Sequence, residues 1–121
     1  MQVWRSAYIR VNGGEYRDGQ DQSTPGYGYG IVFAQSSHHC VARGVVTRNV
    51  RENACSVGSR FCGFVDCEAH SSYDNGFNTH ADGNEDCYFE NCRSYFARSK
   101  GFYAGGVTAQ APDKRVRFVN C

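Results

Sequence analysis

The 121-residue chain contains no leucine, one methionine and two prolines. Its apolar residues are mainly Val, Phe, Tyr, Cys and Ala, and they are accompanied by 14 glycines. Leu and Met are strong helix formers, whereas Val, Phe and Tyr favour strands. This composition argues against helical repeats such as tetratricopeptide or ankyrin units, and it excludes leucine-rich repeats, which need leucine at fixed positions.

An excess of charge is also missing. The chain has 13 Lys and Arg residues against 12 Asp and Glu residues, a net charge of +1, so no general attraction to nucleic acid is expected. No apolar run is long enough for a signal peptide or a membrane span, and we expect no membrane association. Eleven of the cations are Arg. A guanidinium binds carboxylates through two hydrogen bonds, which suits an acidic polysaccharide but equally an ordinary surface ladder.

Three 17-residue blocks align without a gap, at residues 40–56, 62–78 and 87–103, and a fourth copy begins at Val116. Their starts lie 22, 25 and 29 residues apart, so the length variation falls in the connecting segments. A constant block with variable connections is typical of stacked repeats whose insertions map to one face.

Each block reads as three short strands separated by two bends. In the third copy Cys87 and Phe89 share one face, Asn91 breaks the alternation, and a second break falls at residues 100–101. Asn, Asp and Gly tolerate left-handed backbone, so we expect it at both bends. The inward columns of the first strand contain Cys40, Cys62, Cys87 and Val116, then Ala42, Phe64, Phe89 and Phe118. The first bend contains Gly44, Asp66, Asn91 and Asn120, and the second contains Asn53, Asn75 and Lys100 followed by Ala54, Gly76 and Gly101.

At these columns, and at the motifs PGYGYGI (residues 25–31), FENC and FVNC, the chain resembles the pectin-lyase-like superfamily. It is most similar there to bacteriophage tailspikes and related surface-polysaccharide enzymes. The resemblance implies an all-β fold, a right-handed single-stranded parallel β-helix. This solenoid would have about four to five rungs with three short strands per rung.

The expected β-helix covers residues 25–121, and residues 1–24 are expected to be an irregular N-terminal segment or an incomplete first rung. The pattern stops in mid-unit at Cys121. Because solenoids need capped ends, we expect the chain to be a fragment of a longer protein, or to have its ends covered by partner subunits.

Seven cysteines in a small chain can indicate a disulfide framework, but their positions favour buried free thiols. Six occupy inward columns, and Cys55 takes the place of Ile31, Phe77 and Phe102. Cysteines on neighbouring rungs have nearly parallel side chains, a poor geometry for a bridge. We expect no zinc site, because phenylalanine columns intervene and no His points inward.

The outward columns hold the candidate carbohydrate-binding residues. Aromatic rings can stack on sugar faces, and Arg can pair with sugar carboxylates. The alternative is a solvated ladder, with a Glu68–Arg93 ion pair and Tyr73 between two Arg residues, contributing about 0–1 kcal/mol per pair. The predicted binding residues are Arg48, Arg51, Tyr73, Arg93, Tyr95 and Arg98.

Catalytic candidates are weaker. Glu68 and His70 lie on the outward face, and His80 and Asp82 lie in the segment 74–86. Lyases and glycosidases need a base or two carboxylates, which these residues could supply. The same acidic segment could bind calcium, or it could be a plain turn, and no cofactor or metal ligand set is assigned. The pair His38–His39 is expected to be idle.

Three functions remain open at this stage. The leading expectation is a segment of a phage tailspike-like receptor-binding protein that recognises a bacterial surface polysaccharide and could also depolymerise it. The alternatives are a free lyase or epimerase acting on uronates, and a non-catalytic structural rod. The resemblance implies a homotrimer or contact with further domains, and a virion protein made in the host cytoplasm, with secretion as the alternative. Whether the chain is an enzyme stays open.

Overall fold

The computed structural model describes residues 1–18, 28–34, 36–53, 55–57, 59–79, 83–105 and 113–121. These residues contain short strands and no helix, and every strand pairing is parallel. The prediction of an all-β chain is therefore confirmed for the described residues.

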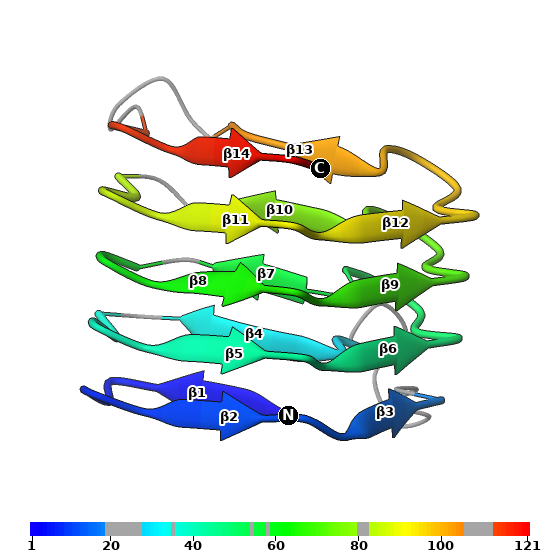
Figure 1. Ribbon diagram of the computed structural model, residues 1–121, viewed down its shortest axis with the longest axis horizontal. Coiled ribbons are helices and arrows are strands. Elements are labelled where there is room, and N and C mark those ends of the chain that lie inside the picture. The colour runs from blue at the N-terminus through cyan, green and yellow to red at the C-terminus, as the bar shows by residue number, and fades with distance from the viewer. Residues whose placement is uncertain (19–27, 35, 54, 58, 80–82, 106–112) are drawn as a thin grey trace.

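The strands form three parallel sheets (Figure 1). The first sheet has the order β1 (Gln2–Trp4), β4 (Ile31–Ala34), β7 (Cys55–Val57), β10 (Phe77–Thr79) and β13 (Phe102–Tyr103). The second has the order β2 (Arg10–Asn12), β5 (Val41–Arg43), β8 (Gly63–Val65), β11 (Tyr88–Glu90) and β14 (Arg117–Val119). The third has the order β3 (Glu15–Arg17), β6 (Val46–Arg48), β9 (Glu68–His70) and β12 (Arg93–Tyr95).

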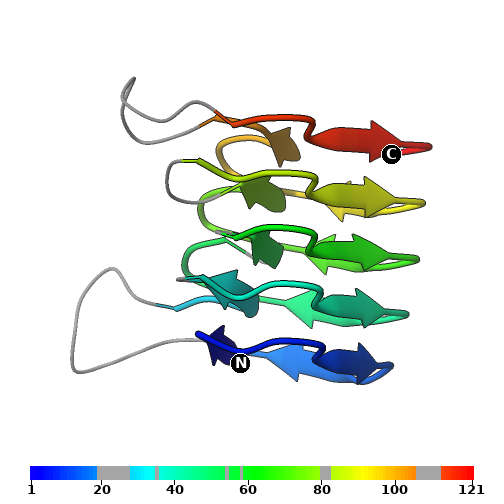
Figure 2. The ribbon, with the colours of Figure 1, turned by 90° about the vertical axis from the view of Figure 1, so that its left-hand side faces the viewer.

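Successive strands belong to successive sheets, so the chain visits all three and returns to the first sheet one strand further along. Figure 2 shows the same layers from the side, with equivalent strands above one another. This arrangement is compatible with the β-helix expected from the sequence. Residues 1–18, expected to be irregular or an incomplete rung, provide β1, β2 and β3, which pair with β4, β5 and β6.

The predicted register of the blocks is confirmed. Phe64 pairs with Ala42 on one side and Phe89 on the other, and Phe89 pairs with Phe118. The rings of Phe64 and Phe89 are stacked with centroids 6.0 Å apart, and those of Phe89 and Phe118 are 4.9 Å apart. Phe77 from the first sheet meets Phe89 edge to face at 5.9 Å. Phenylalanines of two sheets thus fill the interior, in geometries that aromatic pairs prefer.

The first bend has the expected left-handed backbone. Gly44, Asp66, Asn91 and Asn120 have φ angles of 61°, 54°, 52° and 51°. The side-chain amide of Asn91 donates to Asp66 at 3.0 Å, and that of Asn120 donates to Asn91 at 3.2 Å. The polar corner column is therefore linked from one turn to the next.

The prediction for the second bend was wrong in position. The left-handed residues there are Asn49, Ser71 and Phe96, four positions before the predicted column. Asn75 instead donates its side-chain amide to Asn53 at 3.0 Å. Gly76 is required for space, because a Cβ at this position would overlap the Ser94 side chain.

The described cysteines Cys40, Cys62, Cys67, Cys87, Cys92 and Cys121 are free, and all but Cys121 are buried. Burial raises the pKa of the Cys62 thiol to about 12 and that of the Cys87 thiol to about 11. A raised thiol pKa reflects the difficulty of forming a thiolate away from water. The side chain of Cys55 lies outside the described part of the chain.

We expect Phe89→Ala to lower the free energy of unfolding by about 3–5 kcal/mol, because Phe89 is fully buried between two rings. Phe118→Ala should cost clearly less, because its ring is 36% exposed. Urea denaturation of both variants measures the difference. Equal losses would contradict the interior stack described above.

We also expect stability to fall as the pH rises from about 9 to 12. The unfolded thiols lose their protons near pH 9.0, whereas the folded Cys62 and Cys87 keep theirs to about 12 and 11. Above pH 9 the unfolded state therefore binds fewer protons than the folded state, and each unit of difference is worth about 1.4 kcal/mol. Urea denaturation from pH 8 to 11 measures this slope. The double variant Cys62→Ala/Cys87→Ala should flatten it, and an unchanged slope would contradict the assignment.

Candidate functional site

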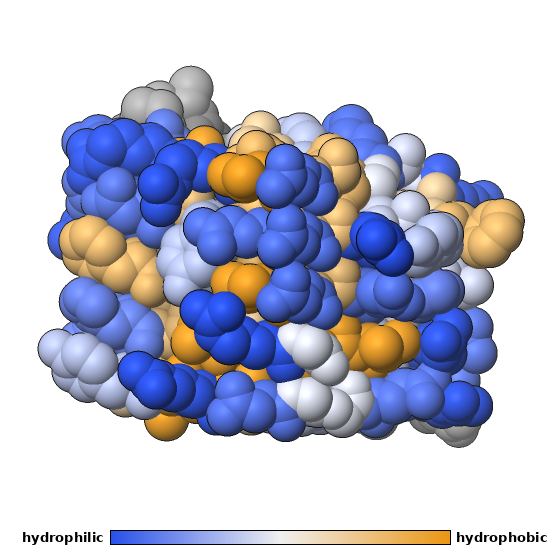
Figure 3. All heavy atoms as spheres, viewed as in Figure 1, coloured by the Kyte–Doolittle hydropathy of each residue, from blue (hydrophilic) through white to orange (hydrophobic). Residues whose placement is uncertain are grey.

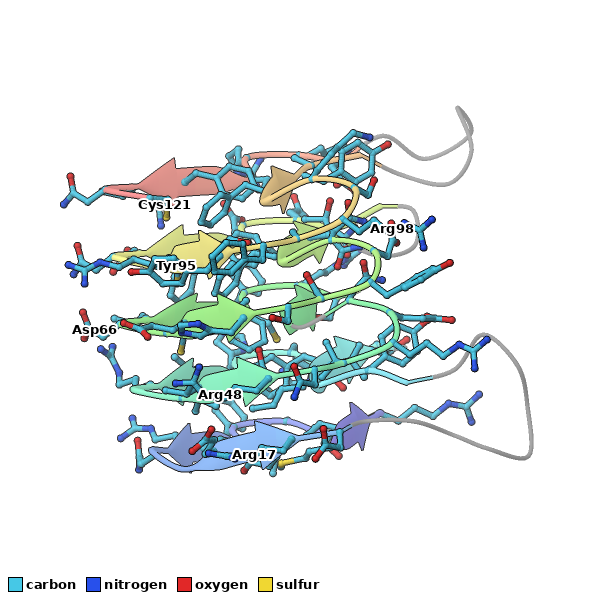
Figure 4. All side chains as sticks on the ribbon, turned by 90° about the vertical axis from the view of Figure 1, so that its right-hand side faces the viewer. Arg17, Arg48, Asp66, Tyr95, Arg98 and Cys121 are labelled. Atoms are coloured by element: carbon cyan, nitrogen blue, oxygen red, sulfur yellow. The ribbon has the colours of Figure 1, made fainter. Side chains whose placement is uncertain are left out.

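The outer face of the third sheet carries two outward columns of the aligned blocks. One consists of Arg48, His70 and Tyr95, and the other of Val46, Glu68 and Arg93. Arg48 pairs with His70, which pairs with Tyr95, and Glu68 pairs with Arg93. Strand β3 extends both columns by one turn, with Glu15 below Val46 and Arg17 below Arg48. Figure 4 shows Arg17, Arg48 and Tyr95 following one another up this face.

Charges on this face are linked to one another. Arg48 Nε donates to Glu15 Oε1 at 2.6 Å, and Arg17 Nε donates to the same oxygen at 2.8 Å. These hydrogen bonds, led by the one from Arg17, lower the pKa of Glu15. Arg93 lies 4.0 Å from Glu68, as the solvated-ladder alternative predicted. Because these groups are largely exposed, such pairs add little stability.

Glu68 and His70 are the two catalytic candidates that the structure brings together. Glu68 Oε2 lies 2.9 Å from His70 Nε2. The His70 ring also stacks on the Tyr95 ring, with centroids 4.6 Å apart. A carboxylate that orients an imidazole can create a general base. His80 and Asp82 lie outside the described residues, so their roles stay predictions.

The other three predicted binding residues meet at the corner that follows the third sheet. The Arg98 guanidinium carbon lies 4.3 Å from the centroid of the Tyr73 ring, a cation–π contact. Arg51, Tyr73 and Arg98 line a hollow of about 480 Å³ together with Phe96. Its lining consists of Asn49, Val50, Arg51, Ser71, Ser72, Tyr73, Phe96 and Arg98. We call this hollow the third-sheet corner hollow.

Exposure distinguishes this hollow from the linked charges beside it. Phe96 is 86% exposed and Tyr73 is 58% exposed. Within the part of the chain that the structure describes, neither Arg51 nor Arg98 belongs to an ion pair. The hollow therefore combines two exposed aromatic rings with two guanidiniums that no carboxylate of the described residues neutralises. The six predicted binding residues thus fall into two groups, one on the sheet and one at this corner.

Sequence reasoning missed two features. Phe96 was not considered, although it directly follows the outward Tyr95. The stacked rings of Tyr8, His39 and Phe61 at the opposite corner were also missed, and His39 was expected to be idle. Extending the repeat alignment by one residue toward the N-terminus would have placed His39 and Phe61 in one column, since each precedes an aligned cysteine.

Within the described residues, no group of three or more His, Cys, Asp or Glu side chains is arranged to hold a metal ion. The same residues include no helix of the length and hydropathy that crossing a membrane requires. No protein-family model, curated protein or solved structure matches the chain.

Proposed function

We propose that the stacked sheets form a right-handed parallel β-helix and that the chain recognises a bacterial surface polysaccharide through the third-sheet corner hollow. The proposal regards the chain as part of a phage tailspike-like receptor-binding protein that assembles as a homotrimer. The observation that carries it is the pair of exposed rings, Tyr73 and Phe96, beside the guanidiniums of Arg51 and Arg98, which have no ion pair within the described part of the chain.

The chemistry of the hollow suits a sugar. A pyranose ring has apolar faces that can lie on aromatic rings, and hydroxyls that accept hydrogen bonds from guanidinium groups. A volume of about 480 Å³ lies within the usual range of ligand sites. Arg51 and Arg98 could each bind the carboxylate of a uronate or sialate through two hydrogen bonds.

The scaffold favours binding of a long polymer. Backbone hydrogen bonds join every strand to its equivalent in the adjacent turns, so the surface columns keep a fixed spacing of about 4.8 Å. Arg98 and Tyr73 come from adjacent turns and are already in contact. A preorganised surface loses little conformational entropy on binding, which leaves more of the contact energy for affinity.

We expect Arg51→Ser/Arg98→Ser and Tyr73→Ala/Phe96→Ala each to weaken glycan binding by at least about tenfold, roughly 1.4 kcal/mol. The glycan is first identified by screening an array of bacterial surface polysaccharides, and affinities are then measured by calorimetry. Arg5→Ser is the matched control, because Arg5 is exposed and lies outside the hollow. A chain that binds no surface glycan, or binds it equally well in both double variants, would refute the proposal and favour the structural rod.

A second candidate function is depolymerisation, and the Glu68–His70 contact at 2.9 Å is the observation that favours it. If this pair acts as base, Glu68→Gln should abolish cleavage while leaving glycan binding within about twofold. Gel filtration of the polysaccharide measures cleavage, and an absorbance rise from an unsaturated product would identify the lyase alternative, tested with and without calcium. Cleavage that survives in Glu68→Gln would exclude this pair as the catalytic centre.

A further inference from the structure

We infer that the second sheet carries a separate binding site for a carboxylated sugar unit, built on the Tyr88 ring, Arg10 and Arg43. The inference rests on the proposed glycan recognition, but it concerns other residues on a different sheet. The site is a hollow of about 460 Å³, which we call the second-sheet hollow. Its described lining consists of Tyr8, Arg10, Asn12, His39, Val41, Arg43, Phe61 and Tyr88.

One lining residue of the second-sheet hollow, Tyr88, has its ring over a glycine of the adjacent strand. Tyr88 pairs with Gly63 of the turn below. A Cβ built at Gly63 would meet the backbone oxygen of Tyr88 and would lie 2.6 Å from both Cδ2 and Cε2 of its ring, so Tyr88 occupies the space that a side chain would need. Glycine at this position therefore lets the Tyr88 ring lie over the adjacent strand. Tyr88 also lines the hollow.

One wall of the hollow is a stack of rings along the corner between the first and second sheets. Tyr8 and His39 are stacked with centroids 5.1 Å apart, and His39 and Phe61 are stacked at 4.8 Å. Tyr8 is 73% exposed and Phe61 is 43% exposed. Figure 3 shows that the face carrying the second and third sheets is mainly hydrophilic, with apolar side chains reaching both side edges.

The corner rings occupy an unfavourable backbone conformation. Tyr8, His39 and Phe61 have φ angles of 60°, 56° and 53°, in the left-handed region that costs a residue with a Cβ about 1–2 kcal/mol. At the first bend the same conformation is adopted by Gly, Asp and Asn, which tolerate it better. Asp86 and Arg115 have φ angles of 53° at the same corner in the later turns, so the conformation belongs to the repeat and does not by itself mark a ligand site.

Positive charge defines the chemistry of the hollow. Arg10 and Arg43 are exposed on adjacent strands, and neither belongs to an ion pair among the residues that the structure describes. Burial raises the pKa of the Tyr88 hydroxyl, and the charge of Arg43 acts in the opposite direction, so Arg43 lies within electrostatic reach of the ring. A sugar ring stacked on Tyr88 would place its carboxylate near these guanidiniums.

Single-stranded nucleic acid also combines stacking faces with negative charge, but it fits the hollow less well. The corner rings are only 4.8 and 5.1 Å apart, which leaves no space for a base between them. The chain has a net charge of only +1, so it lacks the general attraction on which strand binding depends. A carboxylated sugar needs only one stacking face and one or two guanidiniums, and the hollow supplies both.

The test compares methyl glucuronide with methyl glucoside, which differ at the carboxylate, by NMR titration of the full chain with labelled aromatic rings. We expect the glucuronide to shift the Tyr88 and Phe61 signals, and the glucoside to bind about tenfold more weakly or not at all. Arg43→Gln should weaken glucuronide binding about tenfold, while the matched control Arg5→Gln should leave it unchanged, because Arg5 is exposed and lines neither hollow. Gly63→Ala should weaken binding because the added methyl group would meet both the backbone oxygen and the ring of Tyr88, and Arg43→Gln decides the matter if that variant does not fold.

Equal shifts with both sugars, or binding that survives in Arg43→Gln, would overturn the inference. Shifts of the same signals by oligothymidylate at lower concentration than by the glucuronide would replace the sugar with nucleic acid. Shifts that depend on protein concentration alone would assign the surface to a second copy of the chain. Loss of polysaccharide binding in the third-sheet corner variants, with glucuronide binding at Tyr88 intact, would separate the two sites.

Discussion

The structure depends on the parallel, in-register pairing of each strand with its equivalent in the adjacent turns. Phe64 illustrates the constraint, because it pairs with Ala42 below and with Phe89 above. A slip of one residue would move these rings from the interior to the surface. Left-handed residues at the bends end each strand at the same point in every turn, so the backbone geometry of the corners maintains the register.

The same pairing that orders the interior also orders the surface. Every outward side chain lies above its equivalent, so side chains accumulate in columns, as Arg17, Arg48 and His70 do on the third sheet. On that sheet neighbouring columns are linked by side-chain contacts, from Arg48 to Glu15 and between His70 and Glu68. Groups that remain available for a ligand are found toward the edges of the sheets, where the chain turns and the neutralising partners are missing among the described residues.

Two hollows at different corners share one chemical composition. The third-sheet corner hollow combines Tyr73 and Phe96 with guanidiniums, and the second-sheet hollow combines Tyr88 and Phe61 with guanidiniums. In both hollows, aromatic rings are exposed to water. Packing of the interior does not account for these rings, because they lie outside it. The buried thiols of Cys62 and Cys87 have no part in this chemistry, because burial raises the pKa of both and keeps them protonated at neutral pH.

Composition and the repeat alignment together determined the all-β class, and the alignment determined the interior phenylalanine column and the left-handed first bend, because in-register stacking converts an aligned column directly into neighbours in space. Tertiary structure decided the rest. The left-handed residues of the second bend, Asn49, Ser71 and Phe96, also form one aligned column, but they share no residue type that would have marked it. The reason for Gly63 appears only when Tyr88, 25 residues later, is seen to lie across it. Contacts of this kind depend on the direction in which a side chain lies over another turn. An aligned column of the sequence does not specify that direction.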